Sequence, residues 1–227
     1  MRRRPAARAA ADLETRERLL RAAERLFADR GFKKVTVRDI CREARANVAA
    51  VNYHFGDKLG LYREVIQIGI DAMRAATEAG RQAGERQPPD EQLRRFLTIW
   101  IGRLLTPGHE TIHRLMQREL QDPTPAFDEV IDAAVRPRLD YLSAVVARML
   151  DCDPKDQLVL RCVAAAQAPV VAYLPNPIAA RLGFTRPQTP AQIDEAAQHI
   201  AEFAVAGVKA VARRMPDRAA APVRSSR

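Results

Sequence analysis

The stretch Thr36–Lys58, TVRDICREARANVAAVNYHFGDK, decides the fold of this chain. Apolar residues recur at helical spacing between positions 37 and 44, which predicts a short helix with one buried face. Thr36 is placed to cap that helix, and Asn47 is placed to cap a second short helix over 48–53. The segment Arg45-Ala46-Asn47 forms the turn between them. The stretch therefore predicts a helix-turn-helix, followed by a third element that starts at Asp57.

The second helix of the stretch has the residues that a DNA recognition helix needs. Ala49 and Ala50 are small, so the helix can approach another surface closely. Asn52 can pair bidentately with adenine, and the flanking alanines offer methyl contacts to thymine. Hydroxyl and imidazole groups, such as those of Tyr53 and His54, can bind phosphates. This composition predicts a helix that enters the major groove.

The same residues resemble the DNA-binding domain of the tetracycline-repressor (TetR) family. The sequence Tyr-His-Phe-x-x-Lys, which ends at Lys58, is the most specific part, and the resemblance extends back through 15–34 as a first helix. It implies a helix-turn-helix regulator that binds double-stranded DNA. By its chemistry Asn52 is the first candidate for a base-edge contact, with Asn47, Ala49 and Ala50 flanking it. The resemblance also implies phosphate contacts from Thr36, Arg38, Tyr53, His54 and Lys58.

Arg45 departs from the family pattern, because family members usually have Gly at this position of the turn. Gly adopts positive φ freely, whereas Arg in that conformation costs about 1 kcal/mol. Two alternatives follow. Either Arg45 stays right-handed and the turn is altered, or its guanidinium gains a phosphate contact that offsets the strain.

The positive charge of the chain is concentrated at its two ends. The 227 residues carry a net charge of +9. Positions 1–60 hold 15 basic against 8 acidic residues, positions 61–212 hold 17 against 19, and positions 213–227 hold 5 against 1. A basic head on a slightly acidic body is typical of a protein that binds a polyanion with one end. Solvated helix faces are the alternative, but the helix-turn-helix in the same segment favours nucleic acid.

Helix-favouring residues dominate the chain, and no segment predicts a strand, so we expect an all-α fold. Outside the motif, helices are predicted over 13–29, 57–84, 92–105, 109–120, 126–150 (bent near Pro137), 155–173 and 191–213, which makes about nine helices in all. The expected organisation is a flexible basic arm (1–11), a three-helix DNA-binding domain (12–60), a helical ligand-binding and dimerisation domain (61–213) and a disordered tail (214–227).

The second half resembles the effector domain of CecR-like regulators, a subgroup of the TetR family. The resemblance lies in MQRELQDPTPAFDEVI (116–131) and VRPRLDYLSAVVARML (135–150). A pocket for an unknown small-molecule effector is expected between the helices of residues 90–174, where polar-tipped or aromatic residues interrupt apolar faces. Each of them could equally be a satisfied core residue. The candidates are Trp100, His113, Met116, Glu119, Tyr141, Gln167 and Tyr173.

No catalytic site, cofactor or metal site is predicted. His109 and His113 lie four residues apart on a predicted helix, but such a pair without a third ligand is usually helix surface. Ser143 has no nucleophile elbow around it, and no glycine-rich phosphate loop is present. We therefore expect that the protein is not an enzyme.

The sequence predicts neither a membrane span nor a disulfide framework. The longest mostly apolar run, Val163–Leu174, is shorter than the ~20 residues that cross a bilayer, and Gln167 and Pro169 interrupt it. Three widely spaced cysteines, Cys41, Cys152 and Cys162, favour a reducing cytoplasm.

The predicted function is a ligand-released repressor that binds a palindromic operator as a homodimer through the helices around 155–173 and 191–213. The sequence has no signal that separates a repressor from an activator. The alternative from another class is a helical enzyme or protein-interaction module that uses the basic head as a non-specific DNA tether.

Overall fold

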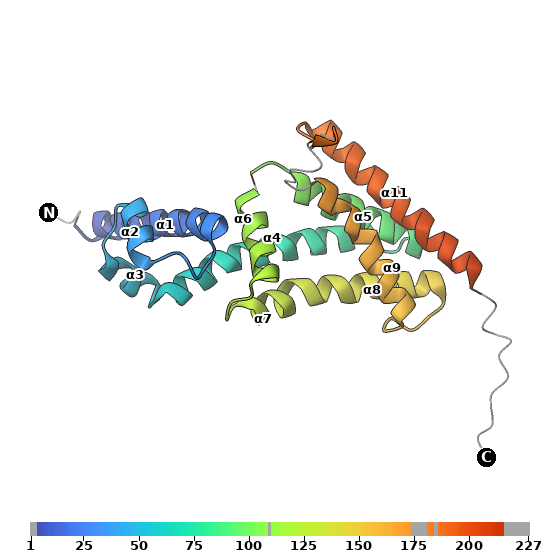
Figure 1. Cartoon of the computed structure of the whole chain (residues 1–227), viewed down its shortest axis with the longest axis horizontal. Helices are drawn as coiled ribbons and strands as arrows, with labels where there is room; N and C mark the ends of the chain where they lie inside the picture. Colours follow the sequence, from blue (N-terminus) through green and yellow to red (C-terminus); the bar gives the residue numbers. More distant parts are fainter. Residues whose placement is uncertain (1–3, 109, 174–180, 184–185, 216–227) are drawn as a thin grey trace, which may run out of the picture. The chain divides into compact units, whose positions relative to one another are not determined.

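A computed structural model describes residues 4–108, 110–173, 181–183 and 186–215 (Figure 1). The described residues form helices joined by short connections and contain no strand, so the all-α prediction is confirmed. The elements in chain order are α1 (Arg4–Arg30), α2 (Val37–Ala44), α3 (Val48–Phe55), α4 (Lys58–Ala83), α5 (Pro89–Leu105), α6 (Glu110–Gln121), α7 (Phe127–Val130), the π-helical turn η1 (Ile131–Val135), α8 (Arg136–Leu150), α9 (Gln157–Gln167), the 3-10 helix η2 (Ala168–Tyr173) and α11 (Pro190–Arg214).

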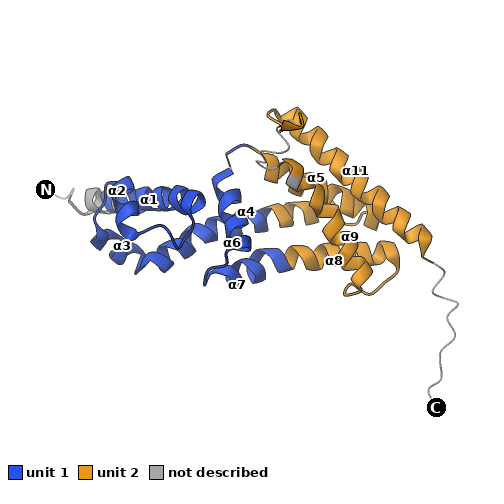
Figure 2. Cartoon of the chain, in the orientation of Figure 1, with its two compact units in different colours: residues 1–75, 107–136 blue, residues 76–106, 137–227 orange. Residues whose placement is uncertain are grey.

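The chain folds as two compact units, each of which combines segments that are distant in sequence (Figure 2). Unit 1 comprises residues 1–75 and 107–136, and unit 2 comprises residues 76–106 and 137–227. The sequence placed a domain boundary at residue 60. The structure divides the chain differently, because the first part of α4 and all of α6 and α7 belong to the same unit as α1–α3.

The core of unit 1 joins α1, α2, α3 and the first part of α4. Fully buried side chains come from each of these helices: Leu19, Phe27, Ile40, Val51 and Leu61. Ile40 lies on the buried face that the helical spacing predicted for positions 37–44. Burial of Val51 fixes α3 with its opposite face outward.

Helix α6 is bound to the C-terminal end of α1. Arg118 donates hydrogen bonds from Nε to the carbonyl oxygen of Ala28 and from Nη2 to that of Asp29, both at 2.7 Å. The last carbonyls of a helix have no partner within the helix, and a cation near them also complements the helix dipole. Arg118 therefore acts as a C-terminal cap supplied by another helix of unit 1.

Unit 2 is a helical bundle in which α5 packs along α11, and α9 also contacts α11 (Figure 1). Thr189 begins α11 with a capping box, in which its side chain and that of Gln192 each accept from the other's backbone N–H. The buried core contains side chains from α5, α8, α9 and α11, among them Phe96, Ile101, Leu142, Val145, Val159 and Ile200.

Two prolines interrupt predicted helices: the one over 126–150, which the sequence expected to bend near Pro137, and the one over 155–173. Pro137 follows the π-helical turn η1, which separates α7 from α8. Pro169 lies in η2, so the helix predicted over 155–173 is α-helical only to Gln167. Proline lacks the N–H that a helix needs and clashes with the preceding turn, which explains both departures.

The N-terminal segment also differs from its prediction. Residues 4–11 belong to α1 rather than to an irregular arm, because Ala and Arg are strong helix formers. Most of the expected disordered tail (214–227), part of the connector before Pro190, and His109 lie outside the described residues. No helix in the described ranges is long and apolar enough to cross a lipid bilayer.

Candidate DNA-binding surface

The cap of α2 uses the residues that the sequence assigned to it. The Oγ1 atom of Thr36 accepts from the N–H of Asp39 at 3.2 Å, and the Asp39 carboxylate accepts from the N–H of Thr36 at 3.1 Å. The Thr36 hydroxyl group also donates to the Asp39 carboxylate at 2.6 Å, and this hydrogen bond, together with the one from the Thr36 backbone N–H, lowers the pKa of the Asp39 carboxyl. The capping box fixes the start of α2, and it leaves the exposed side chain of Arg38 in the first turn.

Arg45 adopts the left-handed conformation, with φ 52° and ψ 47°. The turn therefore keeps the geometry that favours Gly, although the residue has a Cβ atom. This finding excludes the alternative in which Arg45 stays right-handed. The side chain is exposed, and no carboxylate pairs with it in the described part of the chain.

Asn47 begins α3, and its Oδ1 atom accepts from the N–H of Ala50 at 2.8 Å. Because Val51 is fully buried, the opposite face of α3 points away from the core. Ala49, Asn52 and Tyr53 share that face by helical spacing, and Tyr53 is 76% exposed. We call the exposed set from the cap to α3 the recognition surface. It comprises Thr36, Arg38, Arg45, Asn47, Ala49, Asn52 and Tyr53.

His54 and Lys58 are less accessible than the sequence suggested. The His54 side chain is only 7% exposed, and its Nε2 atom lies 3.4 Å from Oδ1 of Asp12 in α1. Lys58 places Nζ 4.3 Å from the centre of the Phe32 ring, and burial lowers the pKa of its ammonium group. Both residues thus support the packing of α3 and α4. Ala50, which the sequence also predicted to contact DNA, is partly buried and lies in the first turn of α3.

The positive charges of unit 1 differ in whether a carboxylate compensates them. On α1, four arginines form ion pairs: Arg16 with Glu64, Arg18 with Glu14, Arg21 with Glu17 and Arg25 with Glu43. Lys34, Arg38 and Arg45 are exposed and have no such partner among the described residues. Arg30 at the end of α1 and Arg74 in α4 are exposed without such a partner as well. Three uncompensated charges nevertheless lie around the helix-turn-helix, where phosphate binding requires them. The sequence analysis missed Lys34, although its position just before the α2 cap was a usable signal.

The seven predicted ligand-binding residues are divided between the two units. His113, Met116 and Glu119 lie on α6 in unit 1, whereas Trp100, Tyr141, Gln167 and Tyr173 lie in unit 2. Glu119 is fully buried and accepts hydrogen bonds from Tyr62 and Thr124, so it has the contacts of a core residue. Tyr141 packs on Phe96 with ring centroids 5.0 Å apart.

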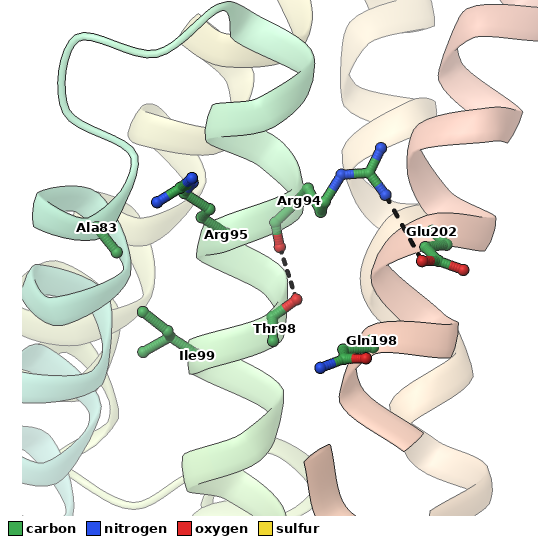
Figure 3. A pocket seen from close by; sticks show the side chains of 7 residues that line it. All are labelled: Ala83, Arg94, Arg95, Thr98, Ile99, Gln198 and Glu202. Atoms are coloured by element: carbon green, nitrogen blue, oxygen red, sulfur yellow. Dashed lines mark hydrogen bonds and ion pairs between the residues drawn. The ribbon is translucent and has the colours of Figure 1, made fainter. Parts of the chain in front are cut away.

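Surface grooves lie between helices in the described part of unit 2. One lies between α5 and α11, encloses about 320 Å³ and contains Arg94, Thr98 and Glu202 (Figure 3). Another lies between α8 and α9, encloses about 450 Å³ and includes Gln167. It also includes Arg138, which the sequence analysis missed. The described residues contain no group of three His, Cys, Asp or Glu that could hold a metal ion.

Comparison with known families assigns the chain to a class of regulators. A family described as "Bacterial regulatory proteins, tetR family" matches residues 19–65. A second, described as "HTH-type transcriptional dual regulator CecR, C-terminal domain", matches residues 89–208, more than half of the chain. The chain belongs to the TetR family of DNA-binding transcriptional regulators and has the CecR-type C-terminal domain. The predicted membership is thereby confirmed.

Individual relatives agree with this assignment. The dual regulator CecR of Shigella flexneri is 26% identical over 169 residues, which are 70% of this chain and 75% of CecR. The repressor BepR of Brucella suis is 41% identical over 53 residues, 23% of this chain and 25% of BepR. A TetR-family regulatory protein from Rhodococcus RHA1 has the same fold, with a TM-score of 0.63, 19% identity, and coverage of 86% of this chain and 96% of that one.

Proposed function

We propose that the protein is a ligand-released repressor that binds a palindromic operator as a homodimer in the cytoplasm. The observation that carries this proposal is the recognition surface, which combines exposed base-reading groups on α3 with uncompensated positive charge around the turn. BepR, which resembles this chain over a 53-residue segment, is named a repressor. This resemblance favours a repressor over an activator. We expect no catalytic activity.

In this proposal, the recognition surface binds DNA together with two neighbouring residues, Lys34 and Ala50. Asn52 reads a base edge with its amide, and Ala49 and Ala50 allow α3 to approach the groove. Arg38, Arg45 and Lys34 bind phosphates, because their charges are exposed and uncompensated. Asn47 contributes its amide NH₂ group, since its oxygen is used in the α3 cap. The buried His54 ring and the Lys58 ammonium position α3 and α4 rather than bind DNA directly.

The homodimer is supported by the apolar surface that α9 and α11 expose in the single chain. Leu160 in α9 is 42% exposed, and Phe203 in α11 is 68% exposed. Small residues surround them and permit close helix packing: Ala164, Ala165 and Ala168 near Leu160, and Ala206, Gly207 and Ala210 near Phe203. A helix that is apolar on most sides, such as α9, must be buried in a core or against a partner chain. A second copy would cover these faces as a four-helix interface.

The link between α6 and α1 offers a route for release from DNA. Because Arg118 caps the end of α1, a displacement of α6 would also disturb the helices that carry the recognition surface. The effector must bind the conformation that does not bind DNA more tightly, since equal affinity for both would shift nothing. We infer that α6 is the element that the effector moves.

Footprinting of the DNA upstream of the protein's own gene tests this function. Two half-sites are expected, with centres about one helical turn, ~34–36 Å, apart. The rival hypothesis is a module with a non-specific basic tether. It predicts uniform protection that disappears with salt at the same rate for every sequence. A single protected half-site would contradict the homodimer.

A further inference from the structure

Val48 is an aliphatic side chain that the core of unit 1 leaves uncovered. It is 43% exposed at the first position of α3, whereas Val51 of the same helix is fully buried. The partly buried apolar residues that pack against this core include Ala50 and Phe55 of α3 but not Val48. Single exposed apolar side chains are common on proteins, so the meaning of Val48 depends on its neighbours.

Those neighbours are the residues of α3 that are proposed to read DNA. Val48 and Asn52 are four residues apart on a helix, so their Cβ atoms lie about 5–6 Å apart on one face. Ala49 and Tyr53 are exposed beside them. The N-terminal residues of a recognition helix are those that contact base edges, and Val48 is the first residue of α3. An isopropyl group and an amide therefore lie side by side at the end of the helix that enters the groove.

The fold fixes the position of Val48 before DNA binds. The Oδ1 atom of Asn47 caps the first turn of α3 by accepting from the N–H of Ala50 at 2.8 Å. Burial of Val51 holds the same turn against the core. A β-branched side chain has one strongly preferred rotamer in a helix, so Val48 loses little side-chain entropy when it makes a contact. Its two methyl groups thus form a rigid apolar surface.

The major groove offers one apolar group to such a surface, which is the C5 methyl group of thymine. Contact between this methyl group and an isopropyl group removes apolar area from water and is favourable. The other base edges present hydrogen-bond donors and acceptors, which the isopropyl group would desolvate without replacing their hydrogen bonds. An aliphatic side chain at this place therefore discriminates in favour of thymine.

We propose that Val48 contacts the methyl group of a thymine and so helps to specify the operator. Successive bases of a strand are roughly 3.4 Å apart along the DNA axis, and the side chains of Val48 and Asn52 begin about 5–6 Å apart. The thymine therefore lies one or two base steps from the adenine that Asn52 reads. This inference rests on the proposed function of α3 and adds the chemistry of a second position in each half-site.

The test starts with a selection from a library of randomised duplexes by the full-length protein, which identifies the preferred site without knowledge of the operator. Each thymine of that site is then replaced by deoxyuridine, which removes the methyl group and keeps the hydrogen-bonding edge. Fluorescence anisotropy measures the affinities. At one thymine of each half-site, the replacement should weaken wild-type binding about 4-fold, and about 15-fold when both half-sites are changed.

Variants assign the effect to one side chain. Val48→Ala should bind the thymine duplex about as weakly as the wild-type protein binds the uracil duplex, and it should no longer distinguish the two. Val48→Thr keeps one methyl group and should retain part of the preference. Ile68→Ala is the matched control, because Ile68 is 44% exposed in α4 of unit 1, and it should retain the full preference. Both truncated side chains are exposed, so the thermal midpoints should stay close to that of the wild type.

Two results would overturn the proposal: equal wild-type affinity for every uracil-substituted duplex, or a preference for thymine that Val48→Ala retains in full at each position. A selected site that lacks a thymine one or two steps from an adenine would also overturn it. An enriched site with any of these results would refute the contact of Val48 and leave the regulator intact. Failure of the selection to enrich any site would refute the proposed function of α3 as well.

Discussion

Tyr62 in α4 donates a hydrogen bond from its hydroxyl group to the carboxylate of Glu119 in α6. Glu119 is 0% exposed, and it also accepts from the N–H and the hydroxyl group of Thr124 at 2.9 and 2.8 Å. A buried carboxylate needs such donors because water does not reach it. The pair therefore connects α4 with α6 inside unit 1, close to the turn where α6 caps α1.

Tyr62→Phe removes the hydroxyl group that donates to Oε2 of Glu119 and leaves this buried oxygen without a partner. The free energy of unfolding is expected to fall by about 1–3 kcal/mol. Urea denaturation followed by circular dichroism measures this change. Tyr53→Phe is the matched control, because Tyr53 is 76% exposed and such surface changes usually stay within about 0.5 kcal/mol. Equal stability of the two variants would show that the hydrogen bond contributes nothing.

Tyr62 should also make the stability of the protein depend on pH in the alkaline range. Burial, followed by the hydrogen bond to Glu119 and its charge, raises the pKa of Tyr62 above its ordinary value of 10.0. The unfolded chain loses this proton near pH 10 while the native protein keeps it, so stability falls as the pH rises above that value. The urea midpoint of the wild type should therefore decline above pH 10. Tyr62→Phe should decline less steeply, and identical slopes would contradict the assignment.

Arg45→Gly is expected to stabilise the fold and weaken DNA binding. Gly relieves the left-handed strain, a gain of about 1 kcal/mol or less after its own entropy cost. If Arg45 binds a phosphate, the variant loses affinity for all sequences, and the slope of log affinity against log salt becomes less steep by about 1. Thermal unfolding and binding titrations at several salt concentrations measure the two effects.

Arg86→Gly is the matched control for Arg45→Gly. Arg86 is also an exposed arginine with positive φ, 63°, but it lies in unit 2 after α4. The Arg86→Gly variant should gain a similar stability and bind DNA as the wild-type protein does. A loss of DNA affinity in both variants would mean that net charge, rather than a specific contact of Arg45, causes the effect.

Gly60 is required by a close approach between backbone segments. A Cβ atom at this position would lie 2.0 Å from the carbonyl oxygen of Phe55, so Gly60→Ala forces the start of α4 away from α3. We expect a loss of about 1–3 kcal/mol, as for other overpacked sites. Gly102→Ala in α5 meets no atom within 4 Å and should instead stabilise its helix by about 0.5–1 kcal/mol. Chemical denaturation of both variants tests this contrast.

Phe203→Asp tests the dimer interface. The 68% exposed Phe203 ring would be buried between copies, and a carboxylate there would be desolvated without a partner. Light scattering should show a monomer, and operator affinity should fall because each copy then reads a single half-site. Leu120→Asp changes an exposed leucine of α6 and should leave the dimer intact. A dimeric Phe203→Asp variant would place the interface elsewhere.

The sequence predicted the local structure of unit 1 because local signals determine it. Thr36 and Asn47 cap the helices that they were expected to cap, and the spacing of Ile40 and Cys41 identified the buried face of α2. The sequence could not decide the conformation of Arg45. That conformation depends on how the flanking helices pack, and this packing overrides the residue's own preference.

The surroundings of individual candidate residues were harder to predict, because they depend on contacts between segments that are distant in sequence. The pairing of Tyr62 with Glu119 spans 57 residues, so the sequence could not show that Glu119 was already satisfied. The burial of His54 against Asp12 was hidden for the same reason. Arg138 carried a signal that was overlooked, since it shares the helical spacing of Tyr141, Leu142 and Val145 and so lies toward the core.

The central claim is that α3 reads a specific DNA sequence through Asn52. Fluorescence anisotropy with DNA from upstream of the protein's own gene tests it most directly, at two salt concentrations and beside a scrambled duplex. We predict a strong preference for the upstream DNA that persists at the higher salt. Asn52→Ala should lose about 1–3 kcal/mol of that preference while keeping its non-specific affinity. Equal, salt-sensitive binding of both duplexes by the wild-type protein would contradict the claim.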